Sequence, residues 1–167
     1  MRTAILCKTR ESKEDEIRRW SSDAEISDEE TSTEHLKAPS PWDITQKALF
    51  LAEPDPAILK AGLAGMVALK TGMAPTHKGG VYVLGSEAPT EFPGRVFHII
   101  DQLPANQRTI RQWCKQHEVN SAHIACRDFP ESPDTLRKSL KLADGGTHYL
   151  FLTRYGLGYQ CFVGLKA

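Results

Sequence analysis

The chain has 167 residues, a formal net charge of zero, and a composition that is 40% hydrophobic and 25% charged. A chain of this length buries about 68–70% of its unfolded surface, enough for one ordinary domain or two small ones without disulfides. No apolar run approaches the roughly 18 residues of a membrane span, and the apolar run within residues 1–7 is too short for a secretory signal. We therefore expect a cytoplasmic protein.

The charge is unevenly distributed along the chain. Residues 1–40 carry seven basic and ten acidic side chains, a net charge of −3. Residues 101–167 carry nine basic and six acidic side chains, a net charge of +3. A modest basic excess in the last third is compatible with contact to nucleic acid but does not by itself predict it.

The first expected element is a short strand, Thr3–Cys7. Residues 11–41 follow and are rich in Ser, Glu, Asp and Thr, so they cannot bury enough apolar surface to offset the entropy cost of ordering them. We interpret this segment as a solvated excursion with a frayed helix over Glu14–Trp20. An acidic binding tail is the less favoured alternative.

A helix over residues 55–71 is the best-marked element in the middle of the chain. It follows an expected strand at Ala48–Leu51; Asp55 can cap its first N–H groups, and Pro56 at the first position loses no hydrogen bond. A further strand is expected at Val81–Leu84. Small residues within a helix lower its stability, and they are tolerable where another backbone packs closely. The candidate docking face consists of Ala61, Gly65 and Ala68.

From Gly94 onward the sequence predicts the order β-α-β-α-β-β. This order has too few strands for a doubly wound nucleotide-binding sheet and fits one sheet covered by two helices. The predicted fold class is α+β. The first expected elements are a strand Gly94–Ile100, a helix Asn106–Glu118 and a strand Ser121–Cys126. The inward face of this helix is expected to carry Ile110, Trp113, Cys114 and His117. A helix follows that is capped by Ser132, has Pro133 in its first turn and ends at Asp144–Gly146, and then a hairpin of His148–Thr153 with Tyr159–Val163.

No catalytic constellation is recognisable. The only G-x-G, Gly156–Gly158, lies between two expected strands rather than before a helix, so it lacks the geometry that cradles phosphates. The four cysteines are far apart with no C-x-x-C pair, which is typical of buried small hydrophobes rather than zinc ligands. We predict that the chain is not an enzyme and holds no metal or cofactor. The histidines that fall within expected strands, for which structural roles are favoured over a cluster, are His98, His123 and His148.

Charged side chains remain as candidates for binding. Glu53 and Asp55 resemble a carboxylate pair, but capping accounts for Asp55 and a structural role is favoured for Glu53. Basic residues spaced i, i+4 share a helix face and can hold phosphates through a long-range, salt-sensitive attraction. Ordinary solvated helix faces are the alternative interpretation. The candidate nucleic-acid-binding residues are Arg108, Arg111, Lys115, Arg127, Arg137, Lys138 and Lys141. Arg127 is expected to leave the edge of its strand beside the helical ones.

Four segments carry motifs that can be compared with a known family. Glu53–Gly62 reads EPDPAILKAG, residues 92–97 read FPGRVF, Arg127–Pro130 reads RDFP, and residues 136–151 read LRKSLKLADGGTHYLF. In this order and spacing they resemble a bacterial family of class I S-adenosylmethionine-dependent methyltransferases that end in a THUMP-like domain. The resemblance covers about residues 42–167.

In such proteins a methyltransferase domain is followed by a ferredoxin-like domain and then by the THUMP-like one. The resemblance implies a ferredoxin-like unit over residues 1–91, with Thr3–Cys7 as its first strand, and a THUMP-like domain over residues 92–167, with small sheets each covered by helices. The sequence has no Gly-rich S-adenosylmethionine loop after a first strand. We therefore expect that cofactor to belong to a methyltransferase domain missing from this chain, which looks like a C-terminal fragment or a naturally short relative.

THUMP domains help RNA-modifying enzymes hold RNA. The resemblance therefore implies a non-catalytic accessory module that binds and positions tRNA or rRNA for a methyltransferase, in cis or in trans, through the basic residues named above. The alternative is a protein-interaction module whose face of Ala61, Gly65 and Ala68 docks a methyltransferase domain and makes no contact with nucleic acid.

Overall fold

The computed structural model of the protein describes residues 48–167. The expected strand Thr3–Cys7, the acidic segment 11–41 and the helix Glu14–Trp20 lie outside the described residues. The domain boundary at residues 91 and 92 stays a prediction.

One sheet of seven strands organises the described residues, and the expected α+β class is confirmed. Its strand order is β2-β3-β1-β4-β7-β6-β5, and only β5 and β6 are parallel, with α5 crossing over between them. The strands are β1 (Phe50–Pro54), β2 (Ala74–Pro75), β3 (Val83–Gly85), β4 (Gly94–Pro104), β5 (His123–Arg127), β6 (His148–Tyr155) and β7 (Gly158–Lys166). The helices are α2 (Pro56–Lys60), α3 (Ala64–Thr71), α4 (Gln107–Gln116) and α5 (Pro133–Leu140).

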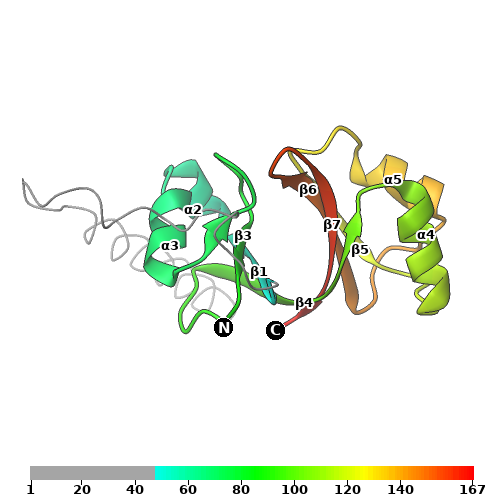
Figure 1. Cartoon of the computed structure of the whole chain (residues 1–167), viewed down its shortest axis with the longest axis horizontal. Helices are drawn as coiled ribbons and strands as arrows, with labels where there is room; N and C mark the ends of the chain where they lie inside the picture. The colour runs from blue at the N-terminus through cyan, green and yellow to red at the C-terminus, as the bar shows by residue number, and fades with distance from the viewer. Residues whose placement is uncertain (1–47) are drawn as a thin grey trace, which may run out of the picture.

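Strand β4 joins the two halves of the described chain. Its residues 94–98 pair with β1, and its residues 97–104 pair with β7. A bulge between Ile99 and Asp101 shifts the register and increases the local twist of the strand. Figure 1 shows the resulting U-shaped sheet, with β4 crossing its base, α2 and α3 outside one limb, and α4 and α5 outside the other. The two small sheets that we expected are therefore one continuous sheet.

Aromatic side chains fill the space between the two limbs. The rings of Tyr82 and Phe151 meet edge to face with centroids 5.4 Å apart, and Phe97 lies 4.7 Å from Phe151. Such contacts between residues of opposite limbs hold the sheet in its curled form. This inner core consists of Leu51, Tyr82, Leu84, Phe97, Ile99, Phe151 and Phe162.

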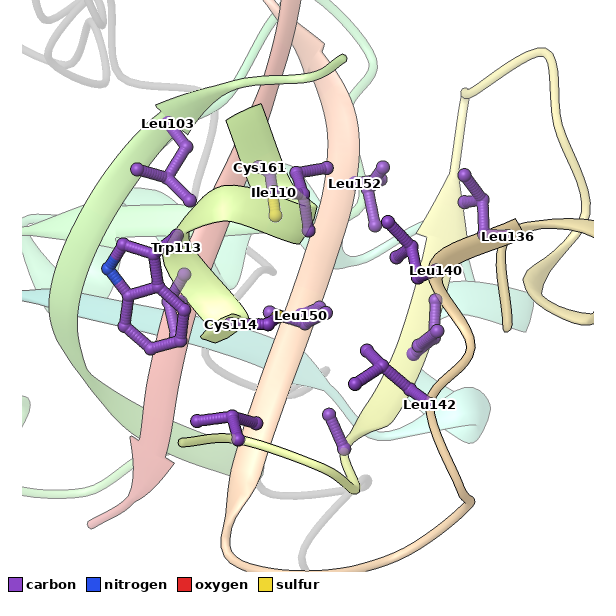
Figure 2. Packing of buried hydrophobic residues seen from close by; sticks show 14 residues of the cluster. Leu103, Ile110, Trp113, Cys114, Leu136, Leu140, Leu142, Leu150, Leu152 and Cys161 are labelled. Atoms are coloured by element: carbon purple, nitrogen blue, oxygen red, sulfur yellow. The ribbon is translucent and has the colours of Figure 1, made fainter. Parts of the chain in front are cut away.

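A larger outer core lies between the sheet and helices α4 and α5. Figure 2 shows the leucines of the α5 side directed towards Leu150 and Leu152 of β6, with Ile110, Trp113 and Cys114 of α4 beside them. The Trp113 indole also donates a hydrogen bond to Asp101 Oδ2 at 2.8 Å, which ties α4 to the bulge of β4. The expected inward face of α4 is confirmed for its apolar residues.

The start of α5 has the cap that the sequence predicts, and the start of α4 has a cap that was not predicted. Ser132 accepts a hydrogen bond from the Thr135 N–H at 3.2 Å, and Asn106 accepts one from the Thr109 N–H at 2.8 Å. The end of α5 was predicted wrongly, because Lys141 adopts a left-handed conformation with φ 58° and stops the helix before Asp144. His117 was expected to face the core but is exposed at the end of α4, stacked on Trp113.

The single helix expected over residues 55–71 is in fact two. Asp55 caps α2 as predicted, but Gly62 takes a φ of +71° and the chain re-enters a helix only at Ala64. A residue without Cβ adopts this left-handed conformation at little cost, so the glycine breaks the helix where the apolar spacing alone predicted continuity. Ile58 of α2 and Val67 of α3 still pack together, because Leu63 lies against both.

Gly94 marks the closest approach of β1 and β4. A Cβ atom at this position would lie 2.2 Å from the carbonyl oxygen of Glu53 and 2.9 Å from Cα of Pro54. Both contacts are with backbone, which cannot move aside as a flexible side chain can. The pairing of these two strands therefore requires glycine at residue 94.

We expect Gly94→Ala to lower the free energy of unfolding by about 2–3 kcal/mol, because the added methyl group overpacks a backbone contact. Chemical denaturation followed by circular dichroism measures the change. Gly158→Ala is the matched control, since a Cβ at the start of β7 would meet no heavy atom within 4 Å. Equal effects of the two substitutions would contradict the steric argument.

Candidate nucleic-acid interface

The basic side chains of α4 and α5 meet on the outer surface of one limb. Arg111 of α4 donates a hydrogen bond to the backbone carbonyl of Ser139 in α5 at 2.6 Å, so the two helices lie side by side. Lys138 and Lys141 belong to the same end of α5 and are exposed. Among the described residues, no ion-pair partner exists for Arg108, Lys115, Lys138 or Lys141. Most of the expected basic residues of the two helices are therefore exposed on neighbouring helices.

Two of the predicted binding residues are placed elsewhere or are already paired. Arg137 is largely covered and contacts the carboxylates of Asp134 and Asp144, at 3.4 and 2.6 Å, so it fixes the end of its own helix. Arg127 leaves β5 on the inner face of the sheet, opposite α4 and α5, and reaches Glu53 of β1. The expectation that Arg127 lies beside the helical basic residues was wrong, because the side chains of a strand alternate between the two faces of a sheet.

The small residues proposed as a docking face do not form one surface. Ala68 is 1% exposed and packs against Ala52, Met73 and Val83, so it cannot contact a further domain. Gly65 is exposed on α3 with open space around its Cα, and Ala61 is exposed in the turn that breaks the helix. Only these two remain available, and they belong to different elements.

The strand histidines do not converge. His98 stacks edge-on against Phe50, His148 lies against Trp113, and His123 stacks on Tyr149 at 4.6 Å. Residues 48–167 contain no group of three or more His, Cys, Asp or Glu side chains arranged to hold a metal ion. Each described histidine of these strands is accounted for by an aromatic neighbour.

The three described cysteines are free thiols in or beside the outer core. Burial raises the pKa of Cys126 to about 11, with the Glu131 carboxylate adding to the effect, and burial also raises the pKa of Cys161. A thiol with a raised pKa is a poor nucleophile at neutral pH, because little thiolate is present. These cysteines act as hydrophobic core residues.

A buried carboxylate held between two arginines lies at one end of the inner core. Glu53 is 6% exposed; its Oε2 contacts Nη2 of Arg95, and its Oε1 lies 3.4 Å from Nη2 of Arg127. Glu53 and Arg95 are direct cross-strand partners of β1 and β4, whereas Arg127 comes from the far edge of the sheet. We call these three residues the Glu53 clamp. The curl of the sheet brings its members together.

Two buried hydroxyl groups lie near the Glu53 clamp. Within residues 48–167, the Tyr82 OH and the Thr153 Oγ1 are buried and have no hydrogen-bond partner of ordinary geometry, although the phenol lies close enough to the Arg127 side chain for that contact to lower its pKa. Thr153 of β6 is paired in register with Arg127 of β5. Burial raises the pKa of Tyr82, Glu53 raises it further, and Arg127 opposes them, so the charged groups nearest to the phenol include two members of the clamp. The phenol therefore stays protonated and keeps a hydrogen to donate.

Sequence reasoning could place the helical basic residues but missed the clamp. Arg95 was not singled out at all, and Glu53 was assigned only a structural role. The three residues come from three of the motif segments already quoted, EPDPAILKAG, FPGRVF and RDFP, which are far apart in the chain. Because the three segments are far apart in the chain, the sequence does not indicate that these residues are in contact. The signal that could have drawn attention to them is that each lies in one of the motif segments.

Comparison with known proteins assigns a family to the region that contains α4, α5 and both clamp arginines. Residues 94–163 match the sequence profile of the family described as THUMP domain-like. This part of the chain is a THUMP-like domain. It begins with β4, includes α4 and α5, and ends within β7. Among the described residues, no helix is long and apolar enough to cross a membrane.

Longer stretches of the chain match proteins that are methyltransferases by name. Two uncharacterized S-adenosylmethionine-dependent methyltransferases of Mycobacterium tuberculosis, from strains CDC 1551 and H37Rv, are each 28% identical over 109 residues. These matches cover 65% of this chain and 30% of each relative. A crystal structure from Porphyromonas gingivalis W83, of a protein provisionally classed as a methyltransferase, superposes with a TM-score of 0.67 at 32% identity. It covers 74% of this chain and 30% of that one.

The Glu53 clamp should contribute to stability through its two ion pairs together. Replacing Arg95 or Arg127 by Met leaves the buried carboxylate one cation, whereas the double variant leaves it none. We expect the double variant to lose about 1–2 kcal/mol more unfolding free energy than the sum of the single losses, because an unpaired buried charge is costly. Urea denaturation of the three variants measures this coupling.

Adding Glu53→Gln to the double variant is the control. It removes the unpaired charge, so part of the lost unfolding free energy should return. Strict additivity of the two arginine substitutions would show that the carboxylate does not depend on them.

Proposed function

We propose that this chain is a non-catalytic, substrate-holding part of an S-adenosylmethionine-dependent methyltransferase, and that the substrate it holds is RNA. The THUMP-like domain and the names of the relatives support the first part. The observation that carries the second is the exposed basic surface of α4 and α5, whose cations are mostly not neutralised by carboxylates of the described residues.

The electrostatic argument favours a polyanion as the partner. Arg111 and Lys115 lie three and seven residues after Arg108 on α4, and Lys138 and Lys141 add exposed cations on the neighbouring helix α5. Exposed cations that lack intramolecular partners attract phosphates without first breaking an ion pair, and each phosphate contact releases condensed counterions. Such contacts position a nucleic acid without reading its sequence.

The chemistry of methyl transfer would be supplied from elsewhere. In this proposal, S-adenosylmethionine binds a methyltransferase domain in cis or in trans, and the present chain orients the RNA towards it. The described residues contribute contacts and charge.

Gel-shift titration against tRNA and an rRNA hairpin at two salt concentrations tests the proposal. We expect the variant Lys115→Glu, Lys138→Glu, Lys141→Glu to bind at least about tenfold more weakly. Its plot of log affinity against log salt should be shallower by about two to three units, roughly 0.7–0.9 for each lost phosphate contact. Arg137 is left unchanged, because it holds the end of its own helix.

Lys60→Glu is the matched control for this experiment. Lys60 is an exposed helical lysine on the opposite limb, so its reversal should leave RNA affinity nearly unchanged. No binding at low salt would overturn the RNA part of the proposal. Equal losses in both variants would indicate a non-specific charge effect and would overturn the assignment of the surface.

A protein-docking role is the second candidate, and the exposed Gly65 on α3 is the observation that favours it. In this case the chain binds a methyltransferase domain through α3 and makes no contact with RNA. We expect Gly65→Leu to abolish co-elution with a co-expressed methyltransferase domain in size-exclusion chromatography. Gly65→Ala, which fits the open space and favours the helix, should preserve it. A complex that survives Gly65→Leu would contradict this docking face.

A further inference from the structure

We infer that Arg95 and Arg127, oriented by Glu53, form a binding site for a single phosphate group on the inner face of the sheet. The site lies on the face opposite the basic surface of α4 and α5. Assigning the bound phosphate to RNA rests on the proposed function, whereas the site itself does not. Free phosphate, a terminal phosphate of an RNA and an internal phosphodiester all present at least two oxygens that share negative charge on a tetrahedral phosphorus, which is the chemistry that the two guanidinium groups recognise.

Within the part of the chain that the structure describes, most N–H donors of the two arginines have no hydrogen-bond partner other than Glu53 and the nearby Tyr82 phenol. A guanidinium carries five N–H donors in a rigid fork, and the contacts of Arg95 and Arg127 with Glu53 each involve one Nη2 atom. The side chains are 61% and 51% exposed, so their remaining donors are accessible from solvent. Glu53 is buried and serves as a fixed anchor between them. Two forks held at one carboxylate are therefore pre-oriented for a ligand with several oxygens.

The charge of the site fits an anion. Two guanidinium groups and one carboxylate leave a net charge of +1. Asp128, which follows Arg127 in the chain, lies with its Oδ2 3.6 Å from Nε2 of His77, a contact that is an ion pair only when the imidazole is protonated. Planar guanidinium forks match phosphate oxygens in pairs, which a lysine cannot do, so the residue type suits an oxyanion better than it suits a simple surface charge.

Two buried hydroxyls beside the arginines are a second sign of an unfilled polar site. Tyr82 and Thr153 are 0% and 1% exposed, and within residues 48–167 neither hydroxyl has a hydrogen-bond partner of ordinary geometry. The Tyr82 phenol still lies close enough to the Arg127 guanidinium for that contact to lower its pKa, so of the two hydroxyls Thr153 is the one without any such neighbour among these residues. Buried polar groups in folded proteins are almost always satisfied, so a pair of unsatisfied ones beside two half-used arginines calls for an explanation. A bound phosphate that shifts the Arg127 side chain would change the hydrogen bonds available to Glu53, Tyr82 and Thr153.

Inorganic phosphate is the first probe, with the intact chain as the protein. We expect saturable shifts of the Arg95 and Arg127 Nε–Hε resonances in NMR titration, and a rise in melting temperature that saturates with the same affinity. Arg95→Lys and Arg127→Lys keep the charge but lose the fork, and each should weaken phosphate binding at least about tenfold. Arg154→Lys, at an exposed arginine on the opposite face of β6, should bind phosphate as the unaltered chain does.

Short RNAs with a 5′-phosphate or a 5′-hydroxyl distinguish the sources of the phosphate. Competition with inorganic phosphate by the 5′-phosphorylated RNA alone assigns a terminal phosphate, and equal competition by both assigns internal phosphodiesters. Competition by neither leaves the phosphate site standing and removes its link to RNA. The assignment of the phosphate site would be overturned by NMR shifts that rise linearly and equally for all arginines as phosphate is added. It would also be overturned if the Arg95→Lys and Arg127→Lys variants bind phosphate as tightly as the unaltered chain. RNA binding that needs α4 and α5 but neither clamp arginine would overturn the site while the proposed function stands.

Discussion

Strand β4 is the constraint on which the rest of the structure depends. Because its residues 94–98 pair with β1 and its residues 97–104 pair with β7, one strand belongs to both limbs of the sheet. The curl that follows closes the inner core around Phe97 and Phe151 and sets two pairs of helices on opposite outer surfaces. Both candidate binding surfaces, the outer helical one and the inner clamp, owe their positions to that single shared strand.

The sequence predicts those parts of the fold that short-range chemistry determines. Asp55 and Ser132 predict where their helices begin, because capping is a contact between residues two or three positions apart. The helix break at Gly62 was not predicted, because the apolar residues keep their helical spacing across it. That spacing does not depend on the backbone conformation of the glycine. The length of β4 and the union of the two sheets depend on pairing between distant strands, which no local pattern records.

The same division applies to the candidate sites. Helical spacing was sufficient to place Arg111 and Lys115 on one surface, since residues four apart on a helix are neighbours. Spacing failed for Arg127, whose side chain lies on the other face of the sheet. It also failed for Ala68, which is buried against Ala52, Met73 and Val83. The meeting of Arg127 with Glu53 joins the first described strand to the far edge of the sheet. Only the curvature of the whole sheet could have revealed it.

The shared strand also limits how such a module can be exchanged between proteins during evolution. The THUMP-like match begins at residue 94, the first residue of β4, so a recombination event at that boundary would strip β4 of β1 as its neighbour. The freed strand would present unpaired backbone groups, a hazard for aggregation, and would expose Phe97 to water. The segment that contains β1 would have to be transferred together with β4. The unit that recombines intact is then larger than the THUMP-like domain.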